Sequence, residues 1–169
     1  TTEESIAQNL GAITNIQVLD NTLFLSVGAD VVVFKPCTEN IFMVNYRPNG
    51  IVDPDTLVVG RTNWIPIGAT IDTLGDPLTI TTGSYRLEIG RDPLRFHMYR
   101  KLAKDNTQLL CEEPSTGGIL SNSAVLTTSG GTFYGVYNRS RGSLTSQTGG
   151  TINAGSQGQA GGPFAWTTQ

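Results

Sequence analysis

Hydrophobic and polar residues alternate with a period of two along much of the first two thirds of the chain. The clearest case is residues 85–89, where Tyr, Leu and Ile alternate with Arg and Glu. Residues 94–99 continue the alternation after a turn at residues 90–93. A period of two is typical of a strand with one buried face. The pattern therefore predicts a hairpin with one face in water and one in the core.

Other strand signals recur at short, regular spacing between turns rich in Gly, Pro, Asn and Asp. Residues 30–34 form an unbroken Val-rich run, typical of a central strand covered on both faces. Pro66 cannot donate a ladder hydrogen bond, so its strand is expected at a sheet edge or a bulge. We therefore predict an all-β fold whose body, residues 12–113, is an antiparallel β-sandwich or jelly roll. The predicted strands are residues 13–19, 22–27, 30–35, 41–47, 56–59, 63–71, 78–82, 84–89, 94–99 and 108–111.

The first residues favour a short N-terminal helix or arm over residues 1–11. Thr1 and Glu4 have the spacing of a capping box, residues 6–10 place apolar side chains on one helical face, and Gly11 ends the pattern. So short a helix needs a surface to pack on, either the body or a partner. The opening residues lack the basic and then apolar order of a signal peptide, and no run is apolar enough to span a membrane. Synthesis and folding in a cytoplasm are therefore expected.

The last 56 residues, 114–169, have a different composition. They hold 12 of the 20 Gly, no acidic residue, and only two charged side chains. Spaced aromatic residues favour burial, so we predict an ordered, extended arm rather than a disordered tail. The arm is expected to oligomerise by burying aromatic side chains against neighbouring copies, namely Phe133, Tyr134, Tyr137, Phe164 and Trp166.

Charge argues against nucleic acid as a partner. The formal net charge is −3, whereas phosphate binding needs a clustered excess of Lys and Arg. Basic residues do gather between residues 91 and 104, but Asp92 interrupts them. We interpret them as solvated strand faces.

Catalytic and metal-binding motifs are scarce. His97 is the single imidazole and lies in mid-strand, and no G-x-S-x-G segment presents a serine. Cys37 and Cys111 lie far apart in sequence and are expected as buried thiols, with a disulfide left open. The sequence thus predicts no catalytic residue, no metal and no cofactor. A carboxylate pair for glycoside hydrolysis stays open, with no two acids singled out among Asp53, Asp72, Glu88, Glu112 and Glu113.

Two stretches carry a resemblance to a known class of protein. NWIPIGATIDTLGDPLTITTGSYRLEIG, followed by LRFHMYRK, is similar to β-sandwich modules of tailed-bacteriophage virion proteins. Residues 127–169 resemble phage fibre and capsid-accessory sequences. The resemblance implies a homo-oligomeric, often trimeric, structural protein on a capsid or tail.

These observations lead to a non-enzymatic virion structural protein that decorates a capsid or forms part of a tail or fibre attachment. Its expected partners are its own copies in a homotrimer, phage capsid or tail proteins, and a host surface glycan. The alternative is a carbohydrate-binding or receptor-binding β-sandwich module. In that case Trp64, Trp166 or residues 133–137 would stack on sugar rings.

Overall fold

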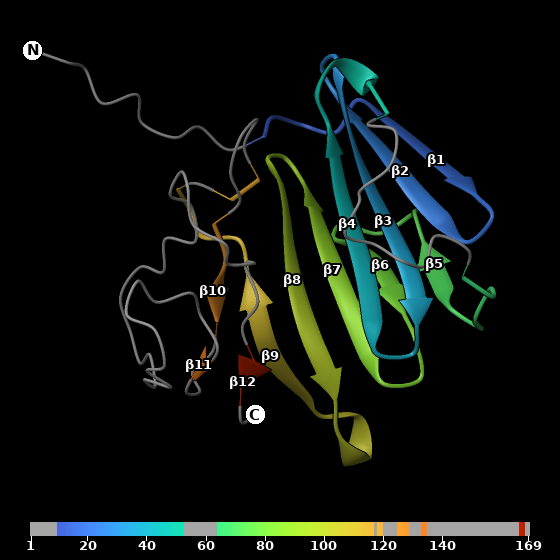
Figure 1. Cartoon of the computed structure of the whole chain (residues 1–169), viewed down its shortest axis with the longest axis vertical. Coiled ribbons are helices and arrows are strands. Elements are labelled where there is room, and N and C mark those ends of the chain that lie inside the picture. The colour runs from blue at the N-terminus through green and yellow to red at the C-terminus, as the bar shows by residue number, and fades with distance from the viewer. Residues whose placement is uncertain are drawn as a thin grey trace, which may run out of the picture. The chain divides into compact units, whose positions relative to one another are not determined.

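The structure is a computed structural model of the 169-residue chain, and it describes residues 10–52, 64–116, 118–119, 125–128, 133–134 and 166–167. Nearly all regular structure in these residues is β-strand, arranged mainly in two antiparallel sheets (Figure 1). The first sheet has four strands in sequence order: β1 (Asn15–Leu19), β2 (Thr22–Val27), β3 (Asp30–Thr38) and β4 (Ile41–Arg47).

The second sheet has six strands in the order β10-β9-β8-β7-β6-β5. They are β5 (Thr70–Asp72), β6 (Leu78–Thr81), β7 (Tyr85–Arg91), β8 (Leu94–Lys101), β9 (Thr107–Glu112) and β10 (Thr127–Thr128). Short 3-10 turns, η1 (Pro48–Gly50) and η2 (Ala103–Asp105), follow β4 and β8. Each sheet is a meander, which places strands adjacent in sequence side by side.

The chain divides into two compact units, residues 1–127 and 128–169. In the second unit, β11 (Phe133–Tyr134) pairs antiparallel with β12 (Trp166–Thr167), with Tyr134 opposite Trp166.

The core lies between the two sheets, because alternate side chains of each sheet point inward. In β2 and β3 the inward side chains are Leu and Val with Phe34, and in β6 to β8 they are Leu and Ile with Phe96. The fully or nearly fully buried members are Leu23, Leu25, Val32, Phe34, Leu78, Ile80, Leu87, Ile89 and Leu94. Burial of each such side chain contributes roughly 1.5–3 kcal/mol, so this layer holds the sandwich together.

Two hairpin turns, one from each sheet, contact each other at one end of the sandwich. The turn after β3 carries Glu39, and the turn after β6 carries Thr82 and Gly83 (Figure 1). The Thr82 hydroxyl donates to the Glu39 carbonyl oxygen at 3.0 Å, and the Gly83 N–H donates to the Glu39 carboxylate. These contacts fix the relative position of the two sheets at that end.

The all-β sandwich predicted from the sequence is confirmed. The bounds of β2 and β4 coincide with the predicted strands, and β3 is central and covered on both faces at Val32 and Val33. The predicted strand at residues 63–71 is shorter than expected, since only Thr70–Asp72 pairs. This strand lies at a sheet edge, and Pro66 precedes it outside any strand.

The predicted N-terminal helix lies mostly outside the described residues. Its last residues, Leu10 and Gly11, are not helical, and the Gly11 carbonyl oxygen accepts a hydrogen bond from the Leu94 N–H at 2.9 Å. Ile13 donates in the same way to Arg91 at 2.9 Å. This segment therefore enters the body as an extended strand-like stretch.

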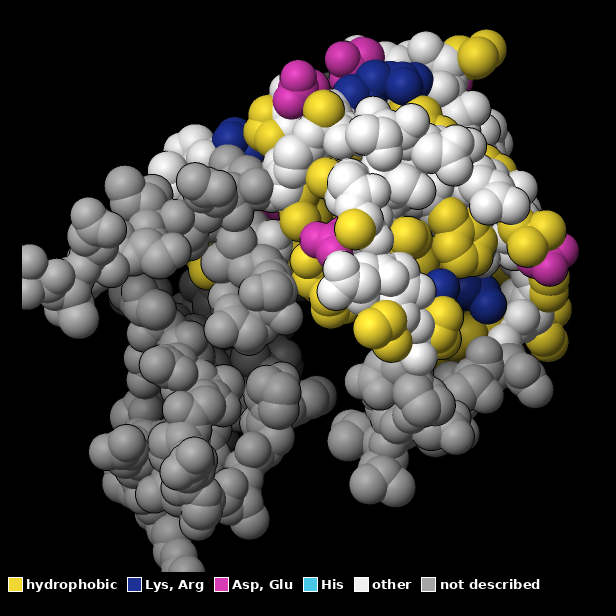
Figure 2. Space-filling view, turned by 90° about the horizontal axis from the view of Figure 1, so that it is seen from above, with side chains coloured by type: hydrophobic (Ala, Val, Ile, Leu, Met, Phe, Trp, Pro, Cys, Tyr) yellow, Lys and Arg dark blue, Asp and Glu magenta, His cyan; other side chains and the backbone are white. Residues whose placement is uncertain are grey.

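The surface of the body carries both hydrophobic and polar side chains. In the view of Figure 2, hydrophobic side chains lie between polar ones, and acidic and basic side chains lie next to one another along the upper edge. Within the described ranges, no helix has both the length and the apolar character needed to cross a membrane.

Candidate functional site

Within the described body, charged and aromatic side chains that could contact a ligand gather on the outer face of the six-stranded sheet. Leu87 and Ile89 point into the core, so their neighbours Arg86 and Glu88 on β7 point outward. The same alternation turns His97 and Tyr99 of β8 outward. This is the wet face of the hairpin that the sequence predicts.

The strand register aligns these side chains in two rows across the sheet. In one row Thr81, Arg86 and Tyr99 lie opposite one another on β6, β7 and β8. In the next row Glu88 lies opposite His97, and His97 lies opposite Glu112 of β9. Neighbouring strands are about 4.8 Å apart, so side chains within a row are in reach of each other.

The Tyr99 phenol lies within electrostatic reach of the Glu88 and Glu112 carboxylates. Glu88 Oε1 pairs with the Arg86 guanidinium at 2.9 Å. Partial burial, followed by the charges of Glu88 and Glu112, raises the pKa of the Tyr99 phenol. Burial and the two carboxylates thus favour the neutral phenol over the phenolate.

A second pair lies beside it. His97 Nε2 is 3.3 Å from Glu112 Oε2, and both side chains are 36% exposed. The ring centroids of His97 and Tyr99 are 6.4 Å apart, with the planes inclined by 32°. The two rings and two carboxylates, with the Arg86 guanidinium that pairs with Glu88, therefore form one continuous, solvent-accessible polar and aromatic patch. We call it the Tyr99 patch, and its residues are Arg86, Glu88, His97, Tyr99 and Glu112.

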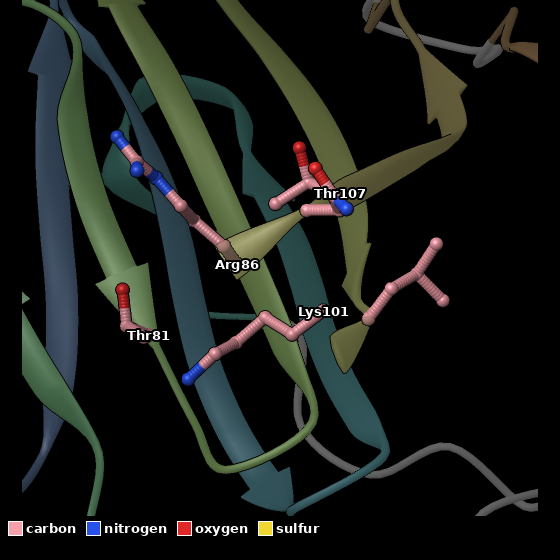
Figure 3. Close-up of a pocket in the computed structure, with 6 residues that line it drawn as sticks. Thr81, Arg86, Lys101 and Thr107 are labelled. Carbon is pink, nitrogen blue, oxygen red and sulfur yellow. The ribbon is translucent and has the colours of Figure 1, made fainter. Parts of the chain in front are cut away.

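A hollow of about 210 Å³ adjoins the patch at Arg86 (Figure 3). Figure 3 shows Arg86 and Lys101 extending from β7 and β8, with Thr81 and Thr107 on either side. The Lys101 ammonium donates to the Thr82 carbonyl oxygen at 3.2 Å, which holds it at the wall of the hollow. The hollow is lined by Thr81, Arg86, Lys101, Leu102, Asn106 and Thr107.

Glu113 occupies a different setting, one residue beyond β9. It is 5% exposed, and burial raises its pKa to about 7, against the opposing effects of the Ile119 N–H, the Arg95 charge and the Phe96 N–H. Among the described residues, Glu113 Oε1 and Arg95 Nε are buried without a hydrogen-bond partner. A Cβ at Gly118 would lie 3.1 Å from Glu113 Oε2, so this carboxyl packs closely under the chain at residue 118.

The carboxylate candidates are thus separated. Glu88 and Glu112 share the outer face, Glu113 is buried, Asp72 lies on the edge strand β5, and Asp53 is outside the described residues. In the described ranges, no group of three or more His, Cys, Asp or Glu side chains is arranged to hold a metal ion. Both cysteines are free thiols.

The structure describes the backbone of three of the five aromatic contact residues predicted from the sequence. Phe133, Tyr134 and Trp166 lie in the β11–β12 pair, whereas Tyr137 and Phe164 lie outside the described residues. Their oligomer contact stays a prediction. The Tyr99 patch was missed as a site, although the alternation in residues 85–89 and 94–99 already places four of its members, all except Glu112, on one face.

Comparison with known proteins points to carbohydrate-active enzymes. Over 174 aligned positions, 95% of this chain is similar to a 1,6-alpha-glucosyltransferase of Sporosarcina globispora, with 32% identity. The aligned region is 13% of that enzyme's length. No protein-family model matches the chain.

Solved structures of the GH31 dextranase of Flavobacterium johnsoniae share the fold. The structure with isomaltotriose and the structure with glucose each have a TM-score of 0.63 to this chain, with 17% identity. Each match covers 81% of this chain and 17% of the dextranase chain.

These findings correct the function predicted from the sequence. A virion structural protein that decorates a capsid or forms part of a tail fibre is wrong, because the relative is a glucosyltransferase and the shared fold is that of a dextranase. The prediction of a non-enzyme is contradicted by the same relative. The chain aligns with only 13% of the glucosyltransferase's length, so the scarcity of catalytic motifs in it does not exclude an enzyme. The virion location, the homotrimer and the phage partners stay untested predictions.

Proposed function

We propose that the chain forms the β-sandwich part of an enzyme that acts on α-1,6-linked glucose chains. The observation that carries the proposal is the 32% identity with a 1,6-alpha-glucosyltransferase along 95% of the chain. The similarity extends over both sheets and is not confined to one motif.

The shared fold supports the same substrate class. The dextranase whose fold this chain shares was solved in complex with isomaltotriose and with glucose. Both are sugars made of glucose units, as the name of the glucosyltransferase also indicates. The chain spans about 13% of the glucosyltransferase and 17% of the dextranase, which makes a complete catalytic centre within it unnecessary. Its expected contribution is the rigid sandwich and a polar face on which a sugar chain can rest.

The test is an assay of the natural polypeptide that carries this sequence. We expect it to release glucose from isomaltotriose, or to transfer its glucosyl units to a second sugar, faster than it acts on cellotriose. Isomaltotriose, maltotriose and cellotriose supplied at equal concentration separate α-1,6, α-1,4 and β-1,4 linkages. A polypeptide that leaves isomaltotriose intact while it cleaves cellotriose, or that acts on none of the three, would contradict the proposal.

A further inference from the structure

We propose that the Tyr99 patch, with the adjoining hollow, is a binding surface for an uncharged gluco-oligosaccharide. The class of sugar rests on the proposed function, whereas the location of the binding surface rests on the geometry of strands β6 to β9. Its residues come from adjacent strands whose register is fixed by the core behind them. The surface is therefore rigid before a ligand arrives, which reduces the entropy lost on binding.

The charges of the surface favour a neutral ligand. Arg86 pairs with Glu88, His97 lies 3.3 Å from Glu112, and Lys101 donates to a carbonyl oxygen. An anionic ligand would have to compete with these partners for the Arg86 and Lys101 cations. Sugar hydroxyls can instead add to the spare lone pairs of the carboxylates and the spare N–H groups of Arg86 without breaking the pairs.

The surface is also accessible. The side chains of Arg86 and Glu88 are 44% and 24% exposed, and His97 and Glu112 are each 36% exposed. Each charged group thus keeps polar atoms in contact with solvent, where sugar hydroxyls can replace water. A buried ion-pair network would offer no such exchange.

Tyr99 supplies the apolar contact that a sugar ring needs. A tyrosine ring has an apolar face and a polar tip, and only two side-chain torsions are fixed when it binds. Here the His97 ring lies beside it, with the two ring centroids 6.4 Å apart. The C–H face of a glucose ring can pack on Tyr99 while its hydroxyl groups reach Glu88 and Glu112.

The hollow extends the surface past one sugar ring. Arg86 belongs both to the Tyr99 patch and to the lining of the hollow, so the two are continuous. Asn106 and Thr107 add uncharged donors and acceptors there, and Leu102 adds apolar area. A ligand with several rings should therefore bind more tightly than glucose alone.

Isothermal titration of the 169-residue chain with isomaltotriose tests the proposal. We expect binding that is tighter than for glucose, and a loss of about tenfold, or 1.4 kcal/mol, in Tyr99→Ala. Tyr99→Phe keeps the ring and should lose less than Tyr99→Ala. Arg86→Ala should weaken binding, whereas Arg47→Ala, a matched change on the outer face of the four-stranded sheet, should not. Thermal unfolding of each variant shows that it remains folded.

The proposal is overturned if the folded chain does not bind isomaltotriose, if Tyr99→Ala and Tyr99→Phe both bind like the unchanged chain, or if glucuronic acid oligomers bind more tightly than isomaltotriose. Its failure differs from failure of the proposed function. If the natural polypeptide cleaves isomaltotriose but this chain does not bind it, the surface is wrong and the function stands. If binding depends on Tyr99 but the natural polypeptide ignores α-1,6 linkages, the surface stands and the function is wrong.

Discussion

The rings of Phe34 and Phe96 meet edge to face between the two sheets, with centroids 5.8 Å apart and planes inclined by 74°. Phe34 belongs to β3 and Phe96 to β8, so this contact joins the centres of both sheets. Such aromatic pairs contribute about 0.5–1.5 kcal/mol beyond the burial of their area.

Phe34→Ala is therefore expected to lower the free energy of unfolding by about 3–5 kcal/mol, since it removes the contact and leaves a cavity. Urea unfolding measures the change. Leu74→Ala, at a side chain that is 94% exposed, is the control and should change it little. Equal effects of the two substitutions would show that the sheets are not held together at Phe34.

Glu113 should make stability fall as pH rises. Its pKa is about 7 in the folded chain, and its ordinary value is 4.5. Below pH 4.5 both states carry the proton; between pH 4.5 and 7 the unfolded state loses it more readily, so folding becomes less favourable. The shift corresponds to about 3 kcal/mol by pH 8. Glu113→Gln should remove most of this fall in urea midpoints measured from pH 4 to 8, and an unchanged pH profile would contradict it.

Asp30 should act in the opposite direction. The Tyr46 hydroxyl donates to it at 2.6 Å and the Asn49 N–H at 2.8 Å, and these bonds lower the pKa of the carboxyl from 3.8. The stability it adds is present above pH 3.8 and is lost as pH falls through the lower folded pKa. Tyr46→Phe should cost about 1 kcal/mol at pH 7, and less at pH 2. A cost that does not change with pH would show that the carboxylate charge plays no part.

The contact between Glu39 and Gly83 can be tested by a double-mutant cycle. A Cβ at residue 83 would lie 2.7 Å from Glu39 Oε2, so Gly83→Ala must displace the carboxylate. We expect Gly83→Ala to cost about 1 kcal/mol in the unchanged chain and close to nothing in a Glu39→Ala background. Additive costs in thermal or urea unfolding would mean that the Glu39 carboxylate and residue 83 are not coupled.

The sequence predicted the strands and the core of the body well, because burial in the core follows the alternation of hydrophobic and polar residues. Leu87, Ile89, Leu94 and Phe96 were all expected on one face, and all four are buried. The edge position was also expected for the segment that includes β5, although Pro66, on which that expectation rested, lies outside the strand. These features depend on local chemistry that a single sequence shows.

The Tyr99 patch could not be predicted to the same degree. Glu112 is 13 residues beyond Tyr99, and only the register between β8 and β9, which includes an irregularity after Met98, brings it opposite His97. Local patterning does not set that register. The burial of Glu113 also depends on chain near Gly118 and Ile119, outside the predicted body.

The virion function predicted from the sequence is wrong for a different reason. Ser-His, zinc and phosphate motifs mark a complete catalytic centre, and a chain that aligns with 13% of an enzyme's length need not contain one. The virion prediction therefore depended largely on the Gly-rich arm, whose composition is not specific to virion proteins. Similarity along the whole chain, rather than any motif, carried the correction.

The most direct test of the account is a map of amide chemical shifts in the isotope-labelled chain as isomaltotriose is added. The account predicts saturable shifts gathered at Tyr99 and its cross-strand neighbours Arg86 and Leu109, and at Thr107 beside the hollow, with β1 to β4 unchanged. Saturable shifts confined to the four-stranded sheet, or no shifts in any strand, would contradict the proposed binding surface.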